Sequence, residues 1–194
     1  MIVRSEQKRK RSAGALTRRA FLKTGMLALA GALCPQALMG SLCPMLPYEK
    51  ALSFYNLHTG EKLETVYWSE GLYDLTALSD INQLLRDFRT GDVKPIDTGL
   101  LDLLHSLHNL MGSRGIFHVV SGYRSPETNA FLRKNDGGVA GRSLHMKGKA
   151  VDFSLPGCSL KTLHKAAVKL QGGGVGYYPA LGFVHVDIGR VRYW

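Results

Sequence analysis

The sequence predicts an α+β domain in which a small antiparallel sheet packs against helices. Segments with the two-residue alternation of strands and segments with the 3.6-residue period of helices occur in mixed order, joined by short links. The sequence shows no regular β-α-β alternation and no internal repeat. This combination is typical of a domain built around an antiparallel sheet rather than of a parallel α/β fold.

The chain has 194 residues, enough for one domain with a sizeable core but not for two of ordinary size. Its formal net charge of +10 is unevenly distributed. Residues 1–30 hold eight of the 25 lysines and arginines and one of the 15 acidic residues, so the rest of the chain carries only about +3. Because the excess positive charge lies at one end, it argues against nucleic-acid binding by the folded domain.

Residues 1–44 are predicted to form an export signal and linker, ahead of a domain at 45–194. Arg18 and Arg19 precede a short apolar run at 26–33, which resembles a bacterial twin-arginine export signal. The run is shorter than the roughly 20 residues of a transmembrane helix. We therefore expect periplasmic localisation through the twin-arginine export machinery, with membrane contact only through this segment. Cleavage of the signal and an uncleaved anchor both remain open.

The first half of the predicted domain contains a hairpin and two helices. Two strand-like runs within residues 52–68 flank the sequence HTGE, with Gly60 in the turn. Apolar residues at helical spacing predict core helices at 75–88 and 100–111.

The second half begins with a strand that runs into a polar loop, in IFHVVSGYR. A helix at 126–135 follows, with proline in its first turn. The remaining expected elements are a strand in KAVDF, a helix at 160–170, and two final strands in GGGVGYYP and GFVHVDIG.

Two polar side chains in SLHMKGKAVD are candidates for a shared site. On a continuous helix, His145 and Asp152 would lie about 10.5 Å apart along the axis, too far to share one ion. Gly148 lies between them and allows the backbone to fold back on entering a strand. Val151 and Phe153 would then face the opposite side of that strand from Asp152.

A second candidate is FVHVD, in which His185 and Asp187 share one face of a strand. Two imidazoles and a carboxylate from these two stretches would suit a catalytic zinc ion, with a fourth position for water. Such an ion would lower the pKa of the water and polarise a carbonyl, which makes amide hydrolysis the natural chemistry. Spacing alone leaves open that the histidines only pack locally.

These stretches together resemble a known family. SGYRS is followed about twenty residues later by SLHMKGKAVD, and then by GVGYYP and FVHVDIGRVRYW. This order is similar to that of the zinc murein peptidases in the hedgehog-like D-Ala-D-Ala metallopeptidase superfamily. Within it, the chain most resembles the periplasmic murein endopeptidase K family, from about residue 52 to residue 194.

The resemblance implies a zinc ion held by His145, Asp152 and His185. It implies that Arg124 faces the scissile carbonyl, where a permanently charged guanidinium would stabilise the developing oxyanion. Ser143 matches a position that binds substrate in related dipeptidases, with a loop hydrogen bond as its alternative.

The tyrosines of GVGYYP are further candidates for substrate contact. Tyr177, with Tyr178 beside it, is expected to line the groove and contact substrate or stabilise an oxyanion. Packing in the core is the alternative.

The general base is the point where this sequence departs from the superfamily. Many relatives have an acidic residue three positions before the last histidine ligand, or a histidine two before it, whereas Gly182 and Phe183 stand there. Asp187 is therefore the candidate base. Its alternative role is to orient a zinc-bound imidazole.

The sequence thus predicts an exported, monomeric zinc endopeptidase that hydrolyses peptide cross-links of peptidoglycan during cell-wall growth or remodelling. No residue distinguishes D,D from L,D bonds. One alternative is a D,D-carboxypeptidase or dipeptidase that trims stem peptides. Another is a zinc-containing module that binds peptidoglycan without hydrolysing it.

Overall fold

The computed structural model describes residues 48–112, 115–136 and 139–194. The predicted export signal lies outside these residues, and the domain boundary at residue 45 stays a prediction. Within the described ranges, no helix is long and apolar enough to cross a membrane.

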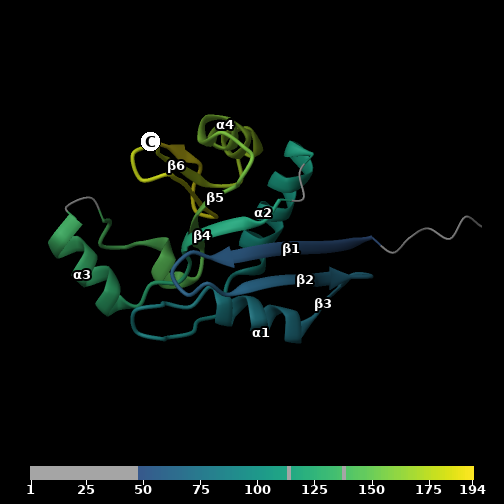
Figure 1. The fold of residues 1–194 in the computed structure, drawn as a ribbon, viewed down its shortest axis with the longest axis horizontal. Coiled ribbons are helices and arrows are strands. Elements are labelled where there is room, and N and C mark those ends of the chain that lie inside the picture. The colour runs from purple at the N-terminus through teal and green to yellow at the C-terminus, as the bar shows by residue number, and fades with distance from the viewer. Residues whose placement is uncertain (1–47, 113–114, 137–138) are drawn as a thin grey trace, which may run out of the picture. The chain divides into compact units, whose positions relative to one another are not determined.

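The described residues form a sheet and several helices, whose order along the chain can be followed in Figure 1. The elements are β1 (Glu49–Asn56), β2 (Lys62–Ser69), β3 (Leu72–Tyr73), α1 (Leu75–Leu84), α2 (Thr98–Met111), β4 (Phe117–Ser121), α3 (Pro126–Asp136), the 3₁₀ helix η1 (Leu144–Lys147), β5 (Ala150–Ser154), α4 (Leu160–Leu170), β6 (Gly174–Tyr178), β7 (Phe183–Asp187) and β8 (Arg192–Tyr193).

The α+β class is confirmed, but the prediction of a small antiparallel sheet is wrong. The described sheet has eight strands in the order β3-β2-β1-β4-β5-β7-β6-β8. It is mixed, because β1 pairs with β4 and β6 pairs with β8 in parallel. The chain passes through α1 and α2 before β4, and such a long connection allows the returning strand to run parallel to β1.

The predicted hairpin is confirmed as β1 and β2, and the helices at 100–111, 126–135 and 160–170 are confirmed to within two residues at each end. The first helix is shorter than predicted and ends at Leu84. The next carbonyl, that of Leu85, accepts a hydrogen bond from Tyr123 N at 2.7 Å. This contact ties the segment after α1 to the loop that follows β4.

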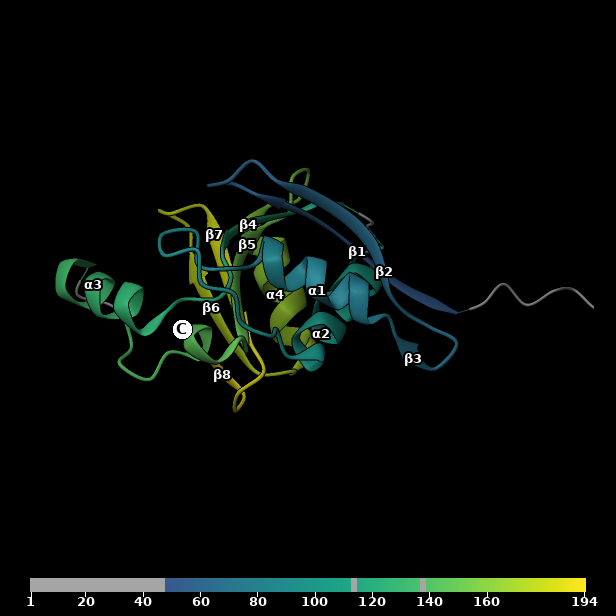
Figure 2. The same ribbon diagram turned by 90° about the horizontal axis from the view of Figure 1, so that it is seen from below.

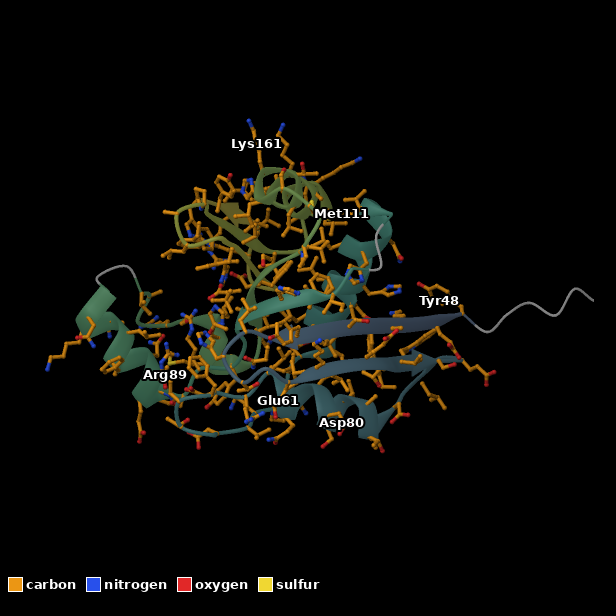
Figure 3. The ribbon with its side chains drawn as sticks, viewed as in Figure 1. Tyr48, Glu61, Asp80, Arg89, Met111 and Lys161 are labelled. Carbon is orange, nitrogen blue, oxygen red and sulfur yellow. The ribbon has the colours of Figure 1, made fainter. Side chains whose placement is uncertain are left out.

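Helices α1, α2 and α4 lie together along one side of the curved sheet (Figure 2). The apolar faces of these helices and the inward side chains of the strands form one buried cluster. Val151 and Phe153 of β5 and Val184 and Val186 of β7 belong to it, as their alternation predicted. Charged side chains such as Asp80 and Lys161 project outward from the helices (Figure 3).

Candidate active site

One row of residues crosses four neighbouring strands on the sheet face opposite the apolar cluster. Ser121 of β4 pairs with Asp152 of β5, Asp152 pairs with His185 of β7, and His185 pairs with Gly176 of β6. Side chains alternate along each strand, so the same apolar positions that fill the core turn Asp152 and His185 to the other face. The row places these two side chains next to each other.

His145 reaches the row from η1, just ahead of β5. Ser143 begins this short helix, and its Oγ accepts a hydrogen bond from His145 N at 3.3 Å. Gly148 ends it in the left-handed conformation, at φ 65°. A Cβ at Gly148 would lie 2.3 Å from the carbonyl oxygen of Pro95, so glycine fits this position for both reasons. The predicted reversal between His145 and Asp152 is confirmed.

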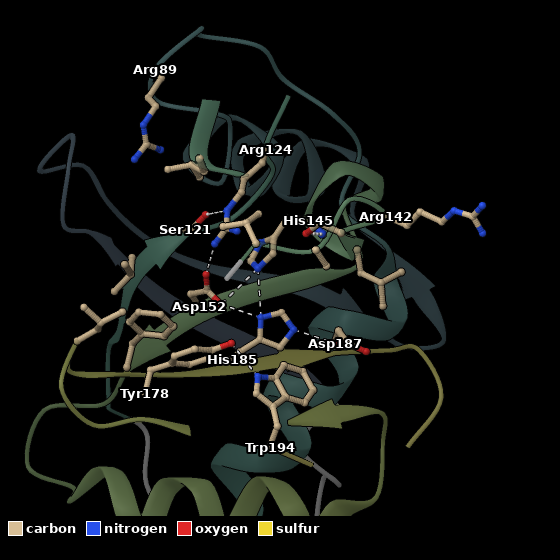
Figure 4. Close-up of a pocket in the computed structure, with 18 of the residues that line it drawn as sticks. Arg89, Ser121, Arg124, Arg142, His145, Asp152, Tyr178, His185, Asp187 and Trp194 are labelled. Atoms are coloured by element: carbon tan, nitrogen blue, oxygen red, sulfur yellow. Dashed lines mark hydrogen bonds and ion pairs between the residues drawn. The ribbon is translucent and has the colours of Figure 1, made fainter. Parts of the chain in front are cut away.

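Three candidate ligand atoms meet at one point, as the close-up in Figure 4 shows. His145 Nε2 lies 3.2 Å from His185 Nδ1 and 3.3 Å from Asp152 Oδ1, and the last two atoms are 2.7 Å apart. Ligand atoms at zinc-binding distances in a tetrahedral site would be separated by roughly 3.3–3.6 Å. The donor set and its spacing therefore fit a zinc ion with small adjustments, and all three residues are buried.

The other ring nitrogen of each histidine is held by an acceptor. His145 Nδ1 donates to the carbonyl oxygen of Gly122 at 2.7 Å, and His185 Nε2 donates to Asp187 Oδ2 at 3.0 Å. These bonds fix the rings and leave His145 Nε2 and His185 Nδ1 facing the shared point, where each nitrogen could bind a metal ion in its deprotonated form.

The same contacts determine the charge states of the cluster. Burial lowers the pKa of His145. Burial also opposes charge on His185, but its hydrogen bonds to Asp152 and Asp187 outweigh burial and raise the pKa of this imidazole. Although burial disfavours its charge, Asp152 has a pKa well below the usual range because of its contacts with His145 and His185. The site therefore contains an ionised carboxylate.

Asp187 is completely buried, and its carboxylate is surrounded by donors. Besides His185, it accepts hydrogen bonds from Gly189 N at 2.8 Å and Gly174 N at 3.1 Å. Arg192 binds both carboxylate oxygens, at 3.1 and 2.6 Å. Both oxygens of Asp187 are thus engaged within the protein.

Arg124 lies on the other side of the cluster. Its Nη2 contacts Asp152 Oδ2, and its Nε donates to Ser121 Oγ at 2.8 Å. The amide of the next residue, Ser125, donates to the buried carboxylate of Asp87 at 2.8 Å. Asp87 therefore holds the loop that presents the guanidinium, a role that no pattern in the sequence indicated.

The cluster opens into a pocket of about 930 Å³. Ser143 and Arg124 both line it. The remaining walls combine apolar and basic side chains; they include His58, Arg89, Leu132, Val139, Ala140, Arg142, Leu144, Tyr178, Leu181, Phe183, Arg192 and Trp194.

The structure does not bring Tyr177 to this pocket. The Tyr177 ring faces α4, and its centroid lies 5.0 Å from that of the His164 ring. Tyr177 therefore packs against the core, which was the alternative to a substrate contact. Its neighbour Tyr178 lies on the face of His185 and lines the pocket. Gly176 pairs with His185, and side chains alternate along a strand, so Tyr178, two residues later, lies on the same sheet face as His185. The sequence alone does not show which residues of the two strands pair.

A buried set of two histidines and one aspartate, beside an arginine in an open pocket, is the arrangement of a metal-dependent hydrolase. Comparison with known proteins agrees with this class. Residues 47–194 match the family model described as peptidoglycan L,D-endopeptidase MepK. The chain belongs to this family.

Curated relatives cover almost the whole chain. Peptidoglycan L,D-endopeptidase MepK of Escherichia coli strain K12 is 41% identical over 177 residues, which are 91% of this chain and 96% of the relative. The protein of the same name from Shigella flexneri has the same identity and coverage. The probable peptidoglycan L,D-endopeptidase MepK of Haemophilus influenzae is 36% identical over 178 residues, or 91% of this chain and 95% of the relative. No solved structure matches the chain.

Proposed function

We propose that this protein is a zinc-dependent peptidoglycan endopeptidase that cleaves L,D cross-links between stem peptides. The convergence of His145 Nε2, Asp152 Oδ1 and His185 Nδ1 beside an open pocket carries this proposal. The names of the relatives support the substrate and the type of bond.

In the proposed mechanism, His145, Asp152 and His185 would hold a zinc ion. When bound there, zinc would supply a Lewis acid, which can polarise a carbonyl group and make water a stronger nucleophile near neutral pH. The Arg124 guanidinium contacts Asp152 Oδ2 and so keeps this carboxylate in place. It also offers a permanent positive charge to the oxygen of the scissile carbonyl as negative charge develops there.

We assign to Asp187 the role of orienting His185. The sequence made it the candidate general base, but a base must accept a proton from water, and both Asp187 oxygens already accept hydrogen bonds from protein donors. The carboxylate–imidazole contact at 3.0 Å is the arrangement that fixes the tautomer and ring angle of a metal-binding histidine.

The pocket favours an endopeptidase over an enzyme that trims the ends of stem peptides. A cavity of about 930 Å³ is near the upper end of ordinary small-molecule sites, which are roughly 300–1,000 Å³. A cross-linked peptide, which continues on both sides of the cleaved bond, needs such room. A carboxypeptidase would instead be expected to enclose the terminal residue.

The test is digestion of purified muropeptide dimers with defined L,D or D,D cross-links, read by mass spectrometry. The zinc-loaded protein should convert L,D dimers to monomers, and a chelator or His185→Ala should abolish the conversion. His105→Ala, which changes a partly exposed histidine on α2, should remain active. Intact dimers together with tight zinc binding would contradict the proposal and favour a binding module.

We further infer export to the periplasm through the twin-arginine machinery and action there as a monomer. The Arg18-Arg19 pair ahead of the apolar run at 26–33 supports export. Replacement of both arginines by lysine should retain the protein in the cytoplasm, as judged by cell fractionation. Undiminished periplasmic recovery of that variant would contradict this route.

A further inference from the structure

Tyr178 and Trp194 form one wall of the pocket beside His185 (Figure 4). The indole Nε1 of Trp194 donates a hydrogen bond to the Tyr178 hydroxyl oxygen at 2.7 Å. The Trp194 and His185 rings lie 5.4 Å apart between centroids, and the Tyr178 ring stacks on Phe183 at 4.7 Å. The Tyr178 hydroxyl is therefore held next to the candidate metal ligands.

A glycine makes room for this wall. Gly176 is the direct strand partner of His185, so a side chain there would point into the same space. A Cβ at Gly176 would lie 2.7 Å from the Trp194 ring and 2.8 Å from the Tyr178 ring. The side chains of Tyr178 and Trp194 can cover the sheet face beside His185 only because residue 176 is a glycine and has no side chain.

The position of Trp194 is fixed by its backbone and by Arg192. Trp194 N donates to Val175 O at 3.2 Å, and Trp194 O accepts from Tyr177 N at 2.9 Å. The Arg192 guanidinium, which binds Asp187, lies 4.9 Å from the centre of the Trp194 ring. One set of contacts thus holds both the His185 ring and the aromatic wall.

The direction of the hydrogen bond decides what Tyr178 can do. An indole N–H only donates, so the Tyr178 oxygen must be the acceptor, and its own O–H remains available to donate to a second partner. In Figure 4, Tyr178 and Arg124 approach the His-Asp-His cluster from opposite sides. A carbonyl oxygen reacting at the cluster would lie between a charged donor and a neutral one.

We propose that the Tyr178 hydroxyl, oriented by Trp194, donates a hydrogen bond to the oxygen of the scissile carbonyl and stabilises the charge that develops there. This inference rests on the proposed endopeptidase function and adds a catalytic residue to it. A pre-positioned donor needs no reorganisation when charge appears on the oxygen, and loss of such a donor lowers kcat on the order of 10²-fold.

The test compares Tyr178→Phe with Tyr177→Phe in the zinc-loaded protein. The first change removes the hydroxyl and keeps the ring that stacks on Phe183, whereas the second removes a hydroxyl from the opposite face of the same strand. Tyr178→Phe should lower kcat on L,D-linked dimers about 100-fold with little change in KM. Tyr177→Phe should match the wild type, and zinc content should be equal in all three.

A second measurement is independent of turnover. A phosphinate analogue of the cross-link presents tetrahedral oxygens in place of the scissile carbonyl, and its dissociation constant can be measured by calorimetry. Tyr178→Phe should weaken this binding by at least tenfold. Trp194→Phe, which keeps an aromatic ring but removes the orienting N–H, should weaken it by a smaller factor.

The outcomes separate the two proposals. A wild-type protein that binds the phosphinate but cleaves no dimer would overturn the endopeptidase function, while the phosphinate comparison would still test Tyr178. Equal phosphinate affinity in the wild type and Tyr178→Phe, or binding by neither, would overturn the role of Tyr178. An increase in KM alone would also overturn it, because the contact would then act on the bound substrate rather than on the reacting oxygen.

Discussion

At the scale of single residues, the position of His185 between two carboxylates is the main feature of the site. Asp152 lies 2.7 Å from Nδ1 and Asp187 lies 3.0 Å from Nε2. The two acids have different surroundings, because Asp152 meets the other candidate ligand atoms whereas Asp187 is enclosed by Arg192 and backbone amides. The same residue type therefore suits the proposed ligand role in one place and the proposed orienting role in the other.

Asp187→Asn should weaken zinc binding roughly 10- to 100-fold, because the amide loses the charge that holds His185 Nε2–H and Arg192. Competition with a chromophoric chelator would measure the affinity. Asp102→Asn is the matched control, since Asp102 also pairs with a cation and two hydroxyl groups, but in a cluster with Lys50, Tyr67 and Tyr73. Unchanged zinc affinity with lost activity would instead restore Asp187 as the general base.

At the scale of elements, the junction between η1 and β5 sets the distance between His145 and Asp152. Gly148 has a positive φ, its amide donates to His145 O at 3.2 Å, and its carbonyl accepts from Asp97 N at 2.9 Å. The junction is therefore fixed from both sides by backbone hydrogen bonds. A side chain at Gly148 has to displace Pro95 or move this turn.

Gly148→Ala should lower the unfolding free energy by more than the roughly 1 kcal/mol expected for alanine at a left-handed position. Gly157→Ala isolates that conformational cost, because Gly157 has φ 81° and open space around its Cβ position. Chemical denaturation of the zinc-free proteins would compare the two. Equal losses would mean that the contact with Pro95 relaxes without cost.

The elements also show where sequence reasoning succeeds and where it stops. The alternation of valines with His185 and Asp187 predicts the two faces of β7, and the glycine in SLHMKGKAVD predicts the reversal before β5. These properties are local. The parallel pairing of β1 with β4 and the pairing of Gly176 with His185 depend on contacts between distant segments, so the sequence did not distinguish Tyr177 from Tyr178.

At the scale of the whole described domain, one sheet face forms the core and the other carries the candidate site. One face packs Val151, Phe153, Val184 and Val186 against helices, and the other presents Asp152 and His185. Because both sets alternate along the same strands, the core also determines the direction of the site residues. Stability and geometry of the site are therefore coupled through β5 and β7.

The charge of the pocket is the property of the whole domain that bears most directly on substrate choice. Among the described residues that line it, four are arginines: Arg89, Arg124, Arg142 and Arg192. The two lining carboxylates, Asp152 and Asp187, are bound to histidines and arginines. A pocket with this balance favours anionic ligands, and peptidoglycan stem peptides carry free carboxylates.

Dimers with free carboxylates should therefore be cleaved with a higher kcat/KM than dimers in which the carboxylates are amidated, and added salt should reduce the difference, because ions screen exposed charges. Arg142→Gln should lower the preference several-fold through KM, since Arg142 is an exposed arginine at the pocket. Arg133→Gln, an exposed arginine on α3, should leave it unchanged. Equal rates on both kinds of dimer at low salt would show that shape rather than charge selects the substrate.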